Sequence, residues 1–332
     1  MPHRFGCGRT WESTVHTISR FPILAAALAT ALAGVAAPAS AATPPLVDVR
    51  VVRHFDPAAG QRPENLTTEA GGAVDLTMSF AHRIDRLAPD GRQTVLATLP
   101  APPDGTHAPL TGRAFVGGIV RLPDGTLYVL YSAGTDDLTG LWRIPPGGSP
   151  SRVAAMPATA VPNGLALHQG FLYASDSALG ALWRIPLAGR TAAVWKRAPE
   201  LAAAPGHFGA NGLKVHGNAV WITNMDRGTL LSIPIGCHGA PGPVHTVATG
   251  LGTVDDFAFT GDADDVLVAD NQGDRVELVR SDGSHTVALT AADGLRNPTS
   301  VTRRGDTVYV ADAAYFTGTD PNLLAARIPR RP

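Results

Sequence analysis

The chain contains the same short motif twice, "VPNGLAL" at residues 161–167 and "GANGLKV" at residues 209–215. Both copies belong to a longer repeat. Runs that alternate apolar and polar residues, such as "LYASD", "VWITN" and "VYVAD", recur roughly every 40 to 50 residues, and Gly, Asp, Asn and Pro separate them. Alternation with a period of two indicates half-buried strands. A repeat of this length is typical of arrays and rings of small sheets.

Alignment of the repeat gives six units, which begin near "PENLTT" (63), "VGGIVRL" (116), "PNGLAL" (162), "ANGLKV" (210), "VDDFAF" (254) and "PTSVT" (298). Most units contain four strand-like runs, and four antiparallel strands repeated around a ring make a β-propeller. The sixth unit lacks its fourth run, whereas "LVDVRVVRHF" at residues 46–55 is a strand without a unit. The sequence therefore predicts an all-β, six-bladed β-propeller with four-stranded antiparallel blades. The N-terminal strand is expected to close the last blade, which removes an open edge.

Residues 1–42 are predicted to be a secretory signal peptide. Arginines precede the apolar run "FPILAAALATALAGVAA" (21–37), and the small residues of "PASAA" follow it. This is the order of a cleaved signal, although an uncleaved membrane anchor is the alternative. We expect residues 43–332 to form the propeller domain of a secreted, extracellular or periplasmic-equivalent protein. It should have no stable membrane association after cleavage.

The charge of the chain argues against one class of partner. The net charge is -1 and no basic stripe is present, so nucleic acid is not an expected partner. We expect a monomer that acts on a small molecule.

The first strand of each blade lines the central channel of a propeller, so the six blade-start positions meet around one axis. These positions are Glu64, Gly117, Asn163, Asn211, Asp255 and Thr299. Two carboxylates crowded on an axis repel each other unless a cation lies between them. Carboxylate and amide oxygens suit calcium first, then magnesium or manganese, and the absence of His and Cys from the ring weakens the case for zinc.

The ring therefore predicts one divalent ion held by Glu64, Asn163, Asn211 and Asp255. The two asparagines have an alternative interpretation, because Asn-Gly is also the strongest hairpin-turn dipeptide.

The six units, with Glu, Asn, Asn and Asp at their starts, resemble the gluconolactonase family, which includes regucalcin (senescence marker protein). The resemblance covers the whole predicted mature chain. It implies a divalent ion on the propeller axis with Glu64, Asn211 and Asp255 as ligands. It also implies that Asn163 contacts substrate or the water on the ion, and that Asp255 is the general base.

This chain departs from the family at two places. "RPENL" stands where many gluconolactonases have a "GEGP" stretch, and Val161 stands where the sugar-lactone members commonly place an Arg that holds substrate hydroxyls. The resemblance therefore implies hydrolysis of lactones or esters without implying a sugar substrate.

The loops between blades and the turns between second and third strands are expected to rim the pocket. His107 and Arg113 lie in the loop at residues 101–113, and His207 lies in the loop at residues 201–209. We predict that these three side chains contact substrate, with His207 as a second candidate base. The alternative for His207 is an exposed loop histidine. Gly117 and Gly118 are expected to leave space for substrate.

Four residues end second strands on the same face: Asp176, Asn224, Asp270 and Asp312. Their side chains either orient the ligands of the ion or form turns.

The predicted function is a metal-dependent hydrolase of lactones or related esters. The ion would polarise the carbonyl, and Asp255 would deprotonate the attacking water. No G-x-S-x-G nucleophile, phosphate loop or zinc signature is present.

Two alternatives remain. One is a non-catalytic propeller that binds a ligand or protein over a structural ion, which the valine at 161 favours. The other is a strictosidine-synthase-like propeller, which needs no metal and which the axial Asn and Asp argue against.

Overall fold

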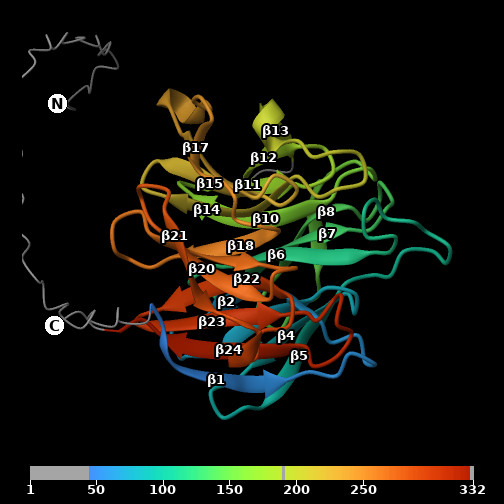
Figure 1. Cartoon of the computed structure of the whole chain (residues 1–332). Coiled ribbons are helices and arrows are strands. Elements are labelled where there is room, and N and C mark those ends of the chain that lie inside the picture. Colours follow the sequence, from blue (N-terminus) through green and yellow to red (C-terminus); the bar gives the residue numbers. More distant parts are fainter. Residues whose placement is uncertain (1–44, 189–190, 330–332) are drawn as a thin grey trace, which may run out of the picture. The chain divides into compact units, whose positions relative to one another are not determined.

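The repeats fold into six four-stranded antiparallel sheets in the computed structural model, which describes residues 45–188 and 191–329 (Figure 1). The first strand of each sheet contacts the first strand of the next, and the sixth contacts the first. The sheets therefore close into a six-bladed β-propeller, and the predicted fold is confirmed. The predicted signal peptide, residues 1–42, lies outside the described residues.

The first three blades follow the order of the chain. Blade one contains β2 (Pro63–Thr68), β3 (Val74–Met78), β4 (Arg83–Leu87) and β5 (Gln93–Thr98). Blade two contains β6 (Phe115–Arg121), β7 (Leu127–Ser132), β8 (Gly140–Ile144) and β9 (Ser151–Ala155). Blade three contains β10 (Pro162–His168), β11 (Phe171–Asp176), β12 (Ala181–Pro186) and β13 (Ala193–Arg197).

The last three blades complete the ring. Blade four contains β14 (Ala210–His216), β15 (Ala219–Asn224), β16 (Thr229–Pro234) and β17 (His245–Ala248). Blade five contains β18 (Val254–Phe259), β19 (Val266–Asp270), β20 (Arg275–Val279) and β21 (His285–Leu289). Blade six contains β22 (Pro298–Arg304), β23 (Thr307–Asp312), β24 (Asn322–Arg327) and β1 (Val47–His54).

Helix is almost absent from the described part of the chain. Three 3-10 turns occur in loops, at Pro199–Leu201, Cys237–Gly239 and Ala291–Asp293. Across residues 45–188 and 191–329, no helix has the length and apolar character that a membrane span requires.

The apolar core lies between neighbouring blades. Each buried cluster joins side chains of two adjacent sheets, as Leu130 of blade two packs with Leu172 of blade three. The second strands β7 and β19 are buried along their whole length, whereas the outer strand β21 is mostly exposed. One blade alone would therefore expose half of each cluster to water, and the ring is the unit that buries the core.

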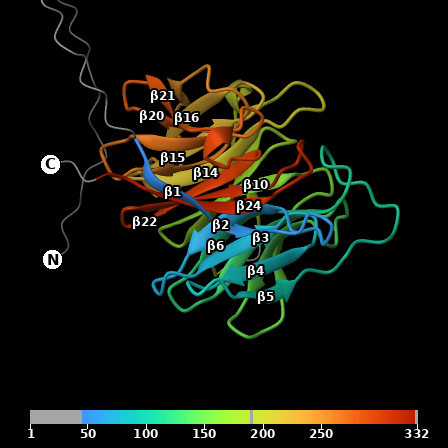
Figure 2. The ribbon, with the colours of Figure 1, turned by 60° about the horizontal axis from the view of Figure 1, so that its bottom comes forward.

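The chain closes the ring with its own N-terminal strand. β1 pairs antiparallel with β24, with Arg50 opposite Ala325 and Val51 opposite Leu324. Figures 1 and 2 both show β1 beside β24. The pairing confirms the predicted closure of the last blade by residues 46–55, and it covers an edge that would otherwise be open.

Removal of β1 should cost much of the stability of the propeller. A chain that starts at residue 56 exposes the edge of β24 and loses the contacts of Leu46 and Phe55, both of which are buried. We expect the loss to be a large part of the roughly 5–15 kcal/mol that stabilises a typical domain. Thermal unfolding followed by circular dichroism checks this against a control chain that starts at residue 45. A peptide of residues 45–55 added in trans should restore part of the loss, and equal melting of the two chains would contradict the closure argument.

Candidate functional site

All six first strands carry a β-bulge at the blade-start position. Pro162 of β10 lies opposite Asp176, whereas Leu165 lies opposite Ala174, so β10 has one more residue than its partner at this point. The other five first strands show the same extra residue. A bulge re-aims the side chains beside it and is common next to binding sites. The same bulge in every blade therefore orients the residues at the six blade starts.

The two Asn-Gly pairs lie at these bulges and do not form hairpin turns. Asn163 and Asn211 lie inside strands, and neither they nor Gly164 and Gly212 have the positive φ that a type I′ turn needs. Glycine is required for a different reason. A Cβ on Gly164 would come within 2.5 Å of the Asn211 carbonyl oxygen of the next blade. The glycines therefore allow neighbouring first strands to approach.

Gly117 and Gly118 do not leave space for substrate, contrary to the prediction. A Cβ on Gly118 would meet the Asn163 carbonyl oxygen and the Leu165 backbone nitrogen, and one on Gly117 would meet the Pro162 carbonyl oxygen at 3.0 Å. The space beside these glycines is filled by blade three. It is not a route for substrate.

The four predicted ligands line one cavity of about 230 Å³ on the propeller axis. The bulges turn them into this cavity, which therefore collects residues from all six blades and their loops. Its lining is Glu64, Phe80, Thr111, Phe115, Asn163, Phe208, Asn211, Met225, Asp255, Asn271, Tyr315 and Phe316. The blade alignment thus identified the polar floor of the cavity, and the predicted convergence of Glu64, Asn163, Asn211 and Asp255 is found in the structure.

The two carboxylates of the floor are electrostatically coupled. Burial raises the pKa of Glu64 to about 8, the hydrogen bond from Tyr315 opposes that rise, and the nearby Asp256 adds to it. Burial also raises the pKa of Asp255 well above its usual range, and the charges of Glu64 and Asp256 raise it further. Two carboxyl groups in this state are those that a cation between them would stabilise.

Neighbouring side chains hold both carboxylates by hydrogen bonds. The Tyr315 hydroxyl donates to Glu64 Oε2 at 2.6 Å, and Asn163 also hydrogen-bonds Glu64. Asn271 Nδ2 lies 3.4 Å from Asp255 Oδ2 and donates to the Pro298 carbonyl at 3.1 Å. These contacts fix the direction of both acidic side chains.

Two amide oxygens in the cavity lack a partner. Asn211 Oδ1 and Asn271 Oδ1 are buried and accept no hydrogen bond, while Asn211 Nδ2 contacts the Met225 sulfur at 3.2 Å. An orphaned buried oxygen is costly unless a ligand satisfies it. Two carboxylates and a free amide oxygen form the donor set that a hard divalent ion prefers, so the residues fit the predicted ion. The described residues contain no group of three or more His, Cys, Asp and Glu side chains placed to hold a metal, and the set relies on amides.

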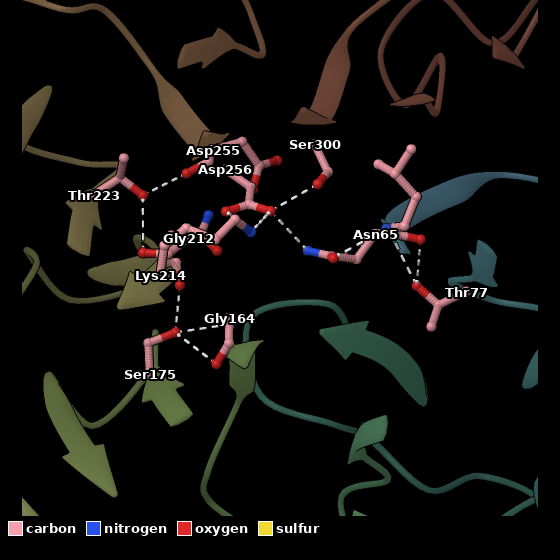
Figure 3. A network of polar contacts seen from close by, with 12 residues as sticks. Asn65, Thr77, Gly164, Ser175, Gly212, Lys214, Thr223, Asp255, Asp256 and Ser300 are labelled. Carbon is pink, nitrogen blue, oxygen red and sulfur yellow. Dashed lines mark hydrogen bonds and ion pairs between the residues drawn. The ribbon is translucent and has the colours of Figure 1, made fainter. Parts of the chain in front are cut away.

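A second polar layer lies next to the floor (Figure 3). Asp256, the residue after Asp255, is buried, and its carboxylate accepts from Lys214 Nζ at 2.6 and 2.8 Å. Ser300 Oγ donates to it at 2.6 Å and Asn65 Nδ2 at 3.1 Å. These four side chains come from blades four, five, six and one, so the network joins four of the six blades.

The charges of the two layers do not balance. When ionised, Glu64, Asp255 and Asp256 carry three negative charges, and Lys214 carries one positive charge, which leaves a formal charge of -2. One divalent cation would neutralise this excess.

The residues that end second strands hold loops and do not line the cavity. Asp176 Oδ1 accepts from the Val161 N–H at 3.0 Å, and Asp270 Oδ1 accepts from the Thr253 N–H at 2.9 Å. Each bond ties the loop that leads into the first strand of the same blade. Asp312 accepts from the Arg296 N–H in the same way, and the Asn224 amide donates to two loop carbonyls. Of the two interpretations offered by the sequence, loop formation is the one these contacts match.

The predicted rim residues lie outside the lining. The Arg113 guanidinium stacks on the ring of Phe80 at 3.8 Å, and Phe80 itself lines the cavity. His207 is 63% exposed and pairs with Asp226 at 3.1 Å, while its neighbour Phe208 faces the cavity. His107 is also absent from the lining. Direct substrate contact by these three side chains stays a prediction that the geometry does not support.

Four further lining residues are not among those predicted from the sequence. Phe80, Met225, Asn271 and Tyr315 all follow the end of a second strand by one to three residues. The turns between second and third strands were expected to rim the pocket. The position of these four residues in the turns can therefore be read from the sequence. The residues that the sequence analysis names are instead the polar ones that end the second strands.

Comparison with known proteins supports the fold. No protein-family model and no curated protein sequence matches this chain. Among solved structures, regucalcin from Agrobacterium tumefaciens, a calcium-binding protein, is similar with a TM-score of 0.63 and 14% identity, over 86% of this chain and 96% of that one. Regucalcin belongs to the family that the blade starts resemble.

Two further solved structures have different described activities. A luciferin-regenerating enzyme has a TM-score of 0.59 and 13% identity, covering 80% of this chain and 91% of that one. A virginiamycin B lyase from Staphylococcus aureus, solved with quinupristin, has a TM-score of 0.56 and 13% identity, covering 85% of this chain and 100% of that one. At these identities the likeness establishes the propeller fold alone.

Replacement of Lys214 should destabilise the propeller. Lys214→Met leaves the buried Asp256 carboxylate without its counter-charge, which typically costs about 3–5 kcal/mol. Urea unfolding in the presence of chelator measures the loss, with Lys196→Met as control because Lys196 bonds only a loop carbonyl. The double variant Lys214→Met/Asp256→Asn should recover most of the stability. A small loss in the single variant would contradict the stabilising role assigned to the Lys214–Asp256 ion pair.

Asp312 and Asp176 should respond in opposite ways to replacement by Asn. Burial raises the pKa of Asp312 well above its usual range, and its Oδ2 has no partner. The folded state therefore holds a proton more tightly than the unfolded state. The contribution of Asp312 to stability is present below the unfolded pKa and declines as the pH rises toward the folded pKa. Asp312→Asn should abolish this slope and stabilise the protein at pH 7 by about 1 kcal/mol or more.

Asp176 provides the matched comparison. Its Oδ2 accepts from the Trp183 indole N–H at 3.0 Å while Oδ1 accepts backbone N–H groups. An Asn cannot accept at both ends, so Asp176→Asn should lose about 1–3 kcal/mol. Denaturant unfolding between pH 4.5 and 8 checks both, and a destabilised Asp312→Asn would mean that its carboxylate is ionised and paired.

Proposed function

We propose that the protein is a secreted, metal-dependent hydrolase of lactones or related esters that works in the axial cavity. One observation carries the proposal. Two neighbouring carboxyl groups, Glu64 and Asp255, share a buried floor with the orphaned amide oxygen of Asn211, and the site has a formal excess charge of -2 when its acidic groups are ionised. The apolar run and small residues at the N-terminus support the proposed export.

Glu64, Asn211 and Asp255 would hold the ion, with Asn163 beside them. A bound divalent ion, calcium before magnesium or manganese, would polarise the substrate carbonyl and favour ionisation of water. Asp255 would accept the proton of the attacking water, because its side chain faces the cavity and is held by Asn271. The Tyr315 hydroxyl holds Glu64 Oε2, and Asn163 also hydrogen-bonds the Glu64 carboxylate.

The polar floor and the apolar wall of the cavity have different roles in the proposed reaction. Asn163 faces the cavity beside Glu64, where its amide can contact the reacting ester group. The aromatic side chains around it exclude bulk water, and electrostatic interactions are stronger in a site that is shielded in this way.

A second candidate is a propeller that binds an apolar ligand over a structural ion. Val161 favours it, because this residue is fully buried and provides no charged group for a substrate. This candidate predicts ion binding without turnover.

The proposal is tested by the metal content of the purified protein and by its response to calcium. We expect about one bound ion per chain and a rise in stability on adding calcium, near 2.7 kcal/mol at 100 times the dissociation constant. Glu64→Gln and Asp255→Asn keep the size of each side chain but remove a charge, so each should weaken binding by tenfold or more. Asp264→Asn is the control, since Asp264 lies outside the cavity and is half exposed. Mass spectrometry and calorimetry provide the readings.

Turnover is measured on the same proteins with a panel of lactones and esters, with and without chelator. Hydrolysis that chelator abolishes and that Asp255→Asn reduces by a hundredfold or more supports the hydrolase. An ion without turnover favours the binding propeller, and no ion at any calcium concentration rejects both.

A further inference from the structure

The wall of the axial cavity is aromatic, and this feature points to a class of substrate. Six of the lining side chains are large and apolar or aromatic: Phe80, Phe115, Phe208, Met225, Tyr315 and Phe316. We propose that the cavity selects lactones or esters that carry an aryl or similarly bulky apolar substituent and discriminates against polyhydroxylated sugar lactones. This inference rests on the proposed hydrolase function for the reaction, but not for the binding preference.

One side of the wall is a preassembled aromatic cluster. Phe80 lies at the centre, with its ring 5.5 Å from that of Tyr315 and 6.0 Å from that of Phe115. Arg113 covers one face of Phe80 at 3.8 Å. Rings held by neighbours lose little conformational freedom when a ligand arrives, so the cluster is ready to bind an apolar group.

The other side of the wall is held just as firmly. Phe208 lies in the loop before blade four, across the axis from blade one. The Asp226 N–H donates to the Phe208 carbonyl at 2.9 Å, and the Met225 N–H donates to the Gly209 carbonyl at 3.1 Å. His207 and the Ala204 N–H both contact the Asp226 carboxylate. An apolar substituent would therefore pack between the Phe80 cluster and Phe208, whose loop these bonds hold in place.

The polar groups of the cavity are too few for a polyol. The carboxylates and amides lie on the floor, where they contact one another and would hold the ion. Tyr315 already donates to Glu64, and Thr111 is the remaining hydroxyl in the lining. Asn271 Oδ1 is free to accept from one hydroxyl. Each further sugar hydroxyl that entered would lose water without gaining a partner, and this penalty is what makes such sites reject polar analogues.

The cavity volume fits a monocyclic aryl compound. A cavity of about 150 Å³ holds benzene, and this one measures about 230 Å³. A five-membered lactone with one phenyl substituent is therefore of suitable size. Phe316 is 64% exposed and its backbone N–H is bonded to Asn297 Oδ1 at 2.9 Å, so an aromatic ring stands at the edge of the cavity.

The test compares γ-phenyl-γ-butyrolactone with γ-butyrolactone, which share the reacting ring, and with glucono-δ-lactone. We expect kcat/KM, corrected for spontaneous hydrolysis, to be at least tenfold higher for the phenyl lactone than for either of the others. Phe208→Ala should lower kcat/KM for the phenyl lactone at least fivefold more than for γ-butyrolactone, so that most of the preference is lost. Phe171→Ala deletes an equal ring outside the cavity, where Phe171 stacks on Arg184, and should leave the preference intact.

Binding is measured separately by calorimetry with 2-phenyltetrahydrofuran, which has no ester to cleave, on protein with chelator. We expect binding that Phe208→Ala weakens by tenfold or more and Phe171→Ala does not. If the phenyl ether binds in this way but no lactone is hydrolysed, the hydrolase proposal fails and the aromatic selectivity stands. If glucono-δ-lactone is the better substrate, or the ether does not bind, the selectivity is overturned while hydrolysis is judged on its own.

Discussion

The close approach of six strands to one axis is the constraint on which the rest of the structure depends. Each first strand bulges at its start, and in blades one, three, four and five the residue at the bulge faces the cavity. In blades two to four the next residue is glycine, because a Cβ there would strike the backbone of the following blade. In blades five, six and one the next residues are Asp256, Ser300 and Asn65, which hydrogen-bond one another instead. Close backbone packing therefore joins the first strands at the glycines of blades two to four, and hydrogen bonds join them in blades five, six and one.

Crowding also explains the electrostatics of the cavity. Glu64 and Asp255 are desolvated because the surrounding strands leave no room for bulk water, and both carboxyl pKa values rise for this reason. Lys214 forms an ion pair with Asp256, but not with Glu64 or Asp255. Glu64 and Asp255 therefore lie buried with no ion-pair partner among the described residues, and such a pair is costly unless a ligand compensates it.

The sequence predicted the architecture well because the repeat determines it. The strand period, the six blade starts and the spare strand at residues 46–55 each follow from local patterns, and alignment of the repeats placed Glu64 and Asp255 on one axis. It could not predict contacts that depend on the third dimension. Phe208 enters the cavity while His207 turns away, and nothing in "GHFG" distinguishes them. Gly118 was interpreted as open space because a sequence does not show what the neighbouring blade occupies.

The pairing of β1 with β24 has a consequence for the order in which the protein is made. Val47 pairs with Arg327, so the first strand to be synthesised must wait for nearly the last residues before its sheet exists. Blades one to five can assemble during synthesis, but blade six cannot. Contacts of such long range slow folding, and the chain stays open while it emerges.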